Sequence, residues 1–148
     1  MLLTTKGRYA VMAMVDIALR GNSSPVILAG IAERQGIDQG YLEQIFIKLK
    51  KSGLVAAVRG PGGGYKLAKV SATIKISEIM KAVNENMKMT RCSNDKKAGC
   101  LNEGARCATH HLWDQMGKHI DSFLSSISLE DVCKRNVTFL NEVHYVKP

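Results

Sequence analysis

Residues 28–51 read LAGIAERQGIDQGYLEQIFIKLKK, and this stretch decides the fold. Apolar residues recur in it at spacings of three and four, first over 28–35 and again over 39–51, which predicts two amphipathic helices. The turn Gly36-Ile37-Asp38 separates them. A short helix, a tight glycine-containing turn and a longer helix are typical of a helix-turn-helix.

A β-hairpin is predicted directly after the second helix. Leu54–Val58 is a β-prone run, RGPGGG at 59–64 is a turn, and Tyr65–Ala68 alternates as a returning strand. The fold class is therefore mainly α with a small β-hairpin, and residues 1–83 are predicted to form a winged helix-turn-helix DNA-binding domain. A phosphate-cradling nucleotide loop is disfavoured, because neither a helix nor a Lys-Ser/Thr pair follows the glycines.

Further helices flank this unit. One is predicted to begin near Thr4 or Thr5, and another to cover Ser77–Val83. Residues 84–111 are predicted to hold a loop, and 105–135 a long helix from about Ala105 and a short last helix capped near Ser128. Residues 136–148 lack a clear pattern and are expected to be a tail without fixed structure. The long helix carries an apolar stripe that is longer than the small domain can cover, and it predicts a dimer interface at Trp113, Met116, Ile120, Phe123 and Leu124.

Charge is distributed unevenly along the 148 residues. Residues 1–91 contain 14 Lys and Arg against 6 Asp and Glu, whereas residues 92–148 contain 7 of each. The whole net charge of +8 therefore lies in the first part, as expected of a module that binds a polyanion. No stretch reaches the ~18 uncharged apolar residues of a membrane span, and a cytoplasmic protein is expected.

The early polar residues of the second helix are expected to face DNA. Glutamine bonds adenine bidentately and glutamate accepts from cytosine N4, while lysines near the helix end suit phosphates. Arg59 in the hairpin turn is expected to enter a minor groove or to clamp a phosphate. The candidates are Gln39, Tyr41, Glu43, Gln44, Lys48 and Arg59.

Three cysteines, Cys92, Cys100 and Cys107, fall within sixteen residues and precede His110 and His111. Thiolates and imidazole suit both zinc and an iron–sulfur cluster. Because the gaps of seven and six residues are wider than the paired ligands of structural zinc, the spacing favours a larger cluster. If the helix is already regular at Cys107, its phase places His110 on the sheltered side and His111 on the wetter side, so His110 is the expected ligand.

Four motifs together resemble the Rrf2 family of bacterial regulators. They are LTTKGRYAV at 3–11, Gly36-Ile37, YLEQ at 41–44 and VRGPGGGY at 58–65, and the resemblance extends over roughly residues 1–133. It implies a homodimeric transcription factor in which the long helix crosses its partner's. It also implies a 2Fe–2S cluster held by Cys92, Cys100, Cys107 and His110, and DNA contacts at Tyr41, Glu43, Gln44, Arg59 and Gly60.

Two features depart from that family's pattern. The cysteine gaps are longer than the five residues expected for each, and Asp38 and Gly40 replace expected serines. The function expected from the sequence is a dimeric regulator without catalytic activity that binds double-stranded operator DNA and senses cluster status. The alternatives are a nitric-oxide or redox sensor of the same fold and a zinc-stabilised interaction module.

Overall fold

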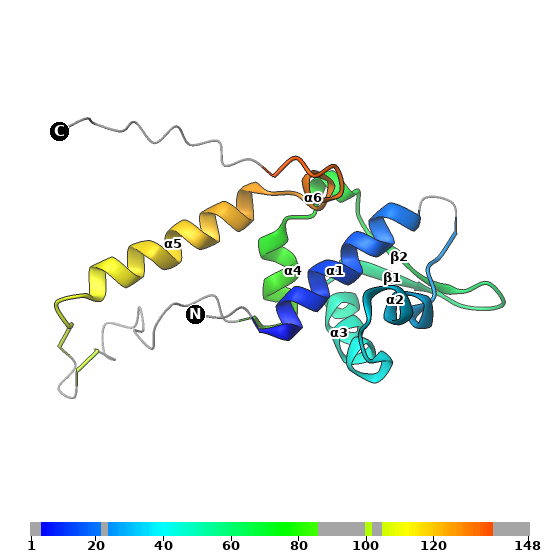
Figure 1. Ribbon diagram of the computed structural model, residues 1–148, viewed down its shortest axis with the longest axis horizontal. Coiled ribbons are helices and arrows are strands. Elements are labelled where there is room, and N and C mark those ends of the chain that lie inside the picture. The colour runs from blue at the N-terminus through cyan, green and yellow to red at the C-terminus, as the bar shows by residue number, and fades with distance from the viewer. Residues whose placement is uncertain (1–3, 22–23, 86–99, 102–104, 138–148) are drawn as a thin grey trace.

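The computed structural model (Figure 1) describes residues 4–21, 24–85, 100–101 and 105–137. In these ranges the chain forms α1 (Thr5–Arg20), α2 (Leu28–Gln35), α3 (Gln39–Lys51), β1 (Val55–Val58), β2 (Gly64–Leu67), a 3-10 turn η1 (Ser71–Thr73), α4 (Ile76–Ala82), α5 (His110–Ser126) and α6 (Leu129–Cys133). The prediction of a mainly helical chain with a small hairpin is confirmed.

The helix-turn-helix has the bounds that the sequence predicts. α2 ends at Gly36, whose left-handed backbone turns the chain, and α3 begins after Asp38. The Asp38 carboxylate accepts a hydrogen bond of 2.8 Å from the Tyr41 amide, so it caps α3. The carboxylate at a position where the family pattern suggested a serine thus performs the same local task that a hydroxyl would.

The hairpin is wider than predicted, because a third segment pairs with it. β1 and β2 are antiparallel, and Val26 forms an isolated bridge to Tyr65, with both N···O distances at 2.8 Å. A Cβ at Gly64 would lie 2.5 Å from the Val26 carbonyl oxygen, so only glycine fits beside this bridge. The first strand was predicted to begin at Leu54 and the second to end at Ala68, and each bound is one residue too far. The Ala68 amide donates to the Leu54 carbonyl, but this single hydrogen bond lies outside the ladder of β1 and β2.

The core lies around α1, which crosses the centre of the body in Figure 1. Phe46 of α3 is fully buried and meets the ring of Tyr65 edge-on at 4.7 Å between centroids. The hairpin and the helix-turn-helix therefore share one core. Its fully buried large side chains include Met14, Ile17, Ile31, Leu42, Ile45, Leu49, Leu54, Ile74, Ile79 and Leu129.

Two helix starts differ from the prediction. The long helix α5 begins at His110 and not near Ala105, where the Ala105 carbonyl accepts from the Leu101 amide (3.1 Å) and a turn from Cys107 to His110 precedes the helix. α4 covers Ile76–Ala82 and not Ser77–Val83, because the Glu78 carboxylate accepts from the Lys75 amide (2.8 Å) and fixes the earlier start. The predicted cap of the last helix is confirmed: Ser128 and Asp131 form a reciprocal capping box.

α5 extends away from α1, α2, α3 and the hairpin in Figure 1. Its C-terminal end is held against the segment before α4 by two backbone hydrogen bonds. The Ile76 amide donates to the Ile127 carbonyl at 3.0 Å, and the Leu129 amide donates to the Ile74 carbonyl at 2.8 Å. Ile127 is buried, and Phe123 and Leu124 pack against the core. The predicted stripe is therefore divided, with its C-terminal part covered within the chain.

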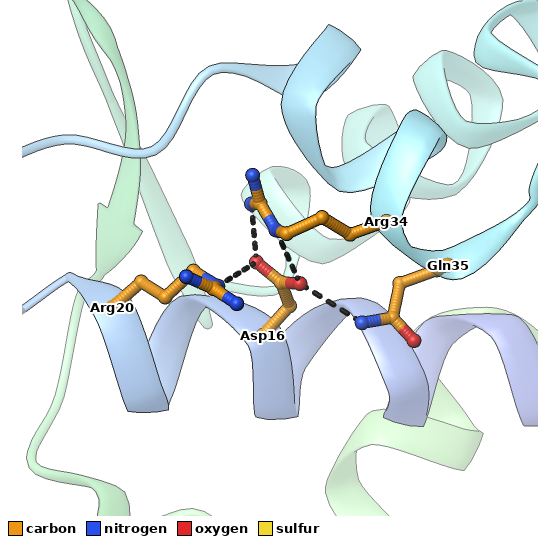
Figure 2. Close-up of polar contacts among 4 residues, drawn as sticks. All are labelled: Asp16, Arg20, Arg34 and Gln35. Atoms are coloured by element: carbon orange, nitrogen blue, oxygen red, sulfur yellow. Dashed lines mark hydrogen bonds and ion pairs between the residues drawn. The ribbon is translucent and has the colours of Figure 1, made fainter.

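A buried carboxylate joins α1 to α2 (Figure 2). Asp16, 3% exposed, accepts from Arg34 Nη2 at 2.6 Å, from Arg34 Nε at 3.0 Å and from Gln35 Nε2 at 2.9 Å. Arg20 Nε lies 3.7 Å from the same group. Burial alone raises the pKa of Asp16, but these hydrogen bonds and the arginine charges outweigh it and leave the pKa below its ordinary 3.8.

Asp16→Asn is expected to lower the free energy of unfolding at pH 7 by about 2 kcal/mol, because hydrogen bonds to a charged group are lost. The pKa of Asp16 is depressed in the folded state, so its contribution is present above the ordinary value of 3.8 and is lost as the pH falls through the folded value. Urea unfolding at several pH values measures this. The difference between wild type and variant should shrink on acidification below 3.8.

Asp121→Asn is the matched control, because Asp121 pairs with Lys81 at 3.4 Å with both side chains about half exposed. Its effect should stay within about 0.5 kcal/mol. An Asp16 variant as stable as this control would show that the buried fork does not hold the two helices together.

Candidate DNA-binding surface and cysteine site

The predicted DNA-reading residues of α3 lie on one exposed face. Gln39, Tyr41, Glu43 and Gln44 are all exposed, and Lys48 is half-buried. Gln39 Nε2 donates to Glu43 Oε1 at 3.3 Å, so the carboxylate is held along the helix surface. The face thus offers amide, phenol and carboxylate groups, which are the donors and acceptors that read base edges.

The hairpin turn presents Arg59 and Gly60 to solvent. The Gly60 carbonyl accepts from the Gly63 amide at 2.9 Å, which closes the turn. In Figure 1 the tip of the hairpin projects from the body beside α2. An exposed guanidinium on a projecting turn has the position that a groove or phosphate contact needs.

Tyr9 is a neighbour of the reading face that sequence reasoning missed. Its ring meets that of Tyr41 edge-on, with centroids 6.0 Å apart. The contact joins the first helix to the N-terminal turns of α3. Its only signal in the sequence was the place of Tyr9 in the motif LTTKGRYAV, and the pairing itself connects residues far apart in the chain.

Two of the predicted cluster ligands come together at the start of α5. Cys100 Sγ lies 3.2 Å from His110 Nδ1, and His110 is 6% exposed. Cys107 is half-buried, with Sγ 3.6 Å from Thr109 Oγ1. Cys92 lies outside the described residues. In the ranges that the structure describes, no set of three or more thiol, imidazole and carboxyl groups is gathered closely enough to hold a metal ion.

Arg106 is a second residue that sequence reasoning missed. Its Nη1 lies 2.9 Å from His110 Nε2 and 3.4 Å from Nδ1. Because a guanidinium only donates, the nearer ring nitrogen Nε2 accepts, which places the imidazole proton on Nδ1, facing the Cys100 sulfur. The sequence holds the arginine one position before Cys107, but nothing in that spacing indicates the contact.

The helical-phase argument for His110 rests on a premise that is wrong. It assumed a regular helix at Cys107, whereas α5 begins three residues later, after a turn closed by the His110 amide on the Cys107 carbonyl (3.0 Å). The difference in exposure that the argument predicted is nevertheless present. His110 is buried and His111 is exposed, although their rings are 5.6 Å apart.

The free end of α5 is rich in uncovered apolar side chains. Leu112 is 57% and Met116 38% exposed, and Trp113 and Ile120 are half-buried. By contrast, Cys133 packs against the core as a small apolar residue, and burial raises the pKa of its thiol. The N-terminal part of α5 therefore presents an apolar face that the core of the described residues does not cover.

A family model for Rrf2, described as iron-dependent transcriptional regulators, matches residues 3–135. The chain belongs to the Rrf2 family. This confirms the resemblance noted in the motifs, and it confirms that the protein is a DNA-binding transcriptional regulator and not an enzyme.

Relatives within this Rrf2 family support the same reading. The HTH-type transcriptional regulator IscR of Xenorhabdus nematophila is 53% identical over 134 residues, which cover 90% of this chain and 80% of the relative. Among solved structures, IscR of T. potens has a TM-score of 0.73 and 38% identity, over 91% of this chain and 88% of that one. CymR, the global cysteine regulator of B. subtilis, has a TM-score of 0.75 and 27% identity, over 91% and 98%. Within the described ranges of this Rrf2 protein, no helix has the length and apolar character to cross a membrane.

Arg59→Ala is expected to weaken binding to a duplex selected by the protein from a randomised pool. Loss of one phosphate contact should also reduce the slope of log K against log salt by about one unit for each Arg59 in the complex. Fluorescence anisotropy over a salt series measures both. Lys134→Ala is the control, since Lys134 directly follows α6 and pairs with Glu130 at 3.2 Å. Equal slopes in the two variants would remove the hairpin from the DNA interface.

Proposed function

We propose that this Rrf2 protein is a cytoplasmic homodimeric regulator whose affinity for operator DNA depends on a 2Fe–2S cluster held by Cys92, Cys100, Cys107 and His110. The observation that carries the proposal is the 3.2 Å approach of Cys100 Sγ to His110 Nδ1. It brings together two members of the ligand set that lie ten residues apart in the chain. The family description and the IscR relatives support the same reading.

The donor chemistry at this place fits such a cluster. Thiolate sulfur and neutral imidazole are ligands that iron–sulfur clusters accept, and the half-buried Cys100 and Cys107 with the buried His110 limit contact with water. When bound, the cluster supplies a group that responds to iron supply, oxidants or nitric oxide. The chain supplies the ligands and brings two of them, Cys100 and His110, together at the start of α5.

For DNA, α3 enters the major groove and the hairpin turn contacts the backbone or the minor groove. Gln39, Gln44 and Glu43 read base edges, and Glu43 penalises sites that lack a donor, because an unpaired carboxylate is repelled by phosphates. Tyr41, Lys48, Arg59 and Gly60 fix the position of the protein on the duplex.

The partner of α5 is a second copy of the chain. The helix has 17 residues, so it is about 25 Å long, and its exposed Leu112 and Met116 form part of an apolar face. Obligate dimer interfaces are apolar in this way. Two-fold symmetry then presents two copies of α3 to half-sites related by a pseudo-palindrome.

His110→Ala is expected to lower retained iron and acid-labile sulfide at least about tenfold after anaerobic reconstitution, because a ligand is lost. His111→Ala is its matched control, being the adjacent but exposed imidazole. Visible absorbance separates an iron–sulfur cluster from colourless zinc in the same samples. Equal retention in both variants, or loss in the His111 variant alone, would overturn the ligand assignment.

Ile120→Glu is expected to weaken the dimer at least about 30-fold, because a carboxylate is then buried without a partner. Sedimentation velocity over a concentration series measures the change. His119→Glu adds the same charge at the neighbouring, exposed position and should leave the dimer intact. If the Ile120 variant still sediments as a dimer, the interface lies on another surface.

A further inference from the structure

Glu85 is a buried carboxylate that neither the DNA-reading face nor the ligand set uses. It follows α4 and is 8% exposed. Its backbone amide donates to the Met80 carbonyl at 3.0 Å, and the preceding residue, Asn84, has a positive φ of 56°. The chain therefore turns sharply at the end of α4, and Glu85 is fixed to that helix.

The Glu85 side chain reaches the first turn of α1, 81 positions away in sequence. Oε1 accepts from the Thr4 amide at 3.2 Å, and Oε2 accepts from the Thr4 hydroxyl. Lys6 Nζ adds a contact of 3.5 Å to the Asn84 carbonyl. A Cβ at Gly7 would lie 2.9 Å from Glu85 Oε2, so the glycine leaves just enough room for the carboxylate.

This contact replaces the usual cap of α1. Thr4 occupies the N-cap position, but its side chain makes no capping hydrogen bond, and the first turn contains no acidic residue. Burial raises the pKa of Glu85, but the hydrogen bonds from Thr4 and Gly7 and the charge of Lys6 outweigh it and lower the pKa. An ionised carboxylate is thus held at the positive end of α1.

Glu85 stands between the two parts of the proposed function. On one side, the same helix α1 carries Tyr9, whose ring meets Tyr41 on the reading face. On the other side, α4 packs against α1 and against α5, where Lys81 pairs with Asp121 in the C-terminal half of the helix that begins with the candidate ligand His110. In sequence, Glu85 lies seven positions before Cys92.

We propose that Glu85 is the positioning residue through which the cysteine site acts on the DNA-reading face, by holding the first turn of α1 and with it the Tyr9–Tyr41 contact. The inference rests on the proposed function. A cluster alters DNA affinity only if some element of the chain is held differently in the two states. The Glu85 contact is suited to that task, because it joins the end of α4 to the helix that supports Tyr41.

The test measures coupling, which is the ratio of DNA affinities with and without the cluster. Glu85→Gln keeps the size of the side chain but turns an amide NH₂ toward donors. Gly7→Ala displaces the carboxylate from the opposite side, through the α1 backbone. In the wild type, DNA affinities with and without the cluster are expected to differ roughly 5–150-fold. In both variants they are expected to differ by no more than about twofold.

Cluster content, measured by iron, sulfide and absorbance, should equal the wild-type value in both variants. A residue with a merely structural role would not lose the ratio of DNA affinities while the cluster content stays at the wild-type value. Glu130→Gln is the control, since Glu130 forms an exposed pair with Lys134 and should keep the wild-type ratio. If one variant fails to load the cluster, the other decides.

Two results overturn the inference alone: a wild-type ratio retained in a cluster-loaded variant, or loss of the cluster from both variants. A reconstituted wild type that contains no cluster, or one that contains the cluster and binds DNA with unchanged affinity, overturns the proposed function, and this inference with it. The two failures are therefore distinguishable in the wild-type sample before any variant is measured.

Discussion

The arrangement of the DNA-reading half depends on one ion pair, between the buried Asp16 carboxylate and the more exposed Arg34. The Asp16 carboxylate is almost inaccessible, and an ionised carboxylate is stable there only while its oxygens have partners. The planar guanidinium of Arg34 meets it with two nitrogens, and Gln35 adds a third donor. Because α3 follows α2 after a turn of three residues, fixing the end of α2 on α1 also fixes the direction in which the reading face points.

The sequence predicts those parts of the fold that depend on neighbouring residues. The bounds of α2 and α3 follow from periodicity and from the turn at Gly36, and the capping box at Ser128 follows from three adjacent positions. The start of α5 does not follow, because the Leu101–Ala105 hydrogen bond and the turn from Cys107 to His110 before the helix leave no periodic pattern in the sequence. The Val26 bridge is equally hidden, since a lone residue in a loop shows no strand pattern.

The candidate site divides in the same way. Exposure of Gln39, Tyr41, Glu43 and Gln44 follows from helical phase, which is local. At Asp38 the residue differs from the serine that the family pattern suggested, but its carboxylate caps α3 as a hydroxyl would. A difference in residue type therefore does not by itself indicate a difference in local structure. The Glu85–Thr4 contact joins residues 81 positions apart, so it becomes visible only when the chain is folded. Arg106 and His110 are only four positions apart, but helical spacing does not predict their contact, because α5 begins at His110.

The bridge between Val26 and Tyr65 determines where this domain tolerates changes of chain length. An added residue within β2 shifts the pairing by one position and turns Tyr65 away from Phe46. The tip of the hairpin lies beyond the last paired residues, Val58 and Gly64, and bears no such constraint. An insertion at the tip therefore leaves the pairing intact, and the reach of the hairpin can change in evolution while α3 keeps its place.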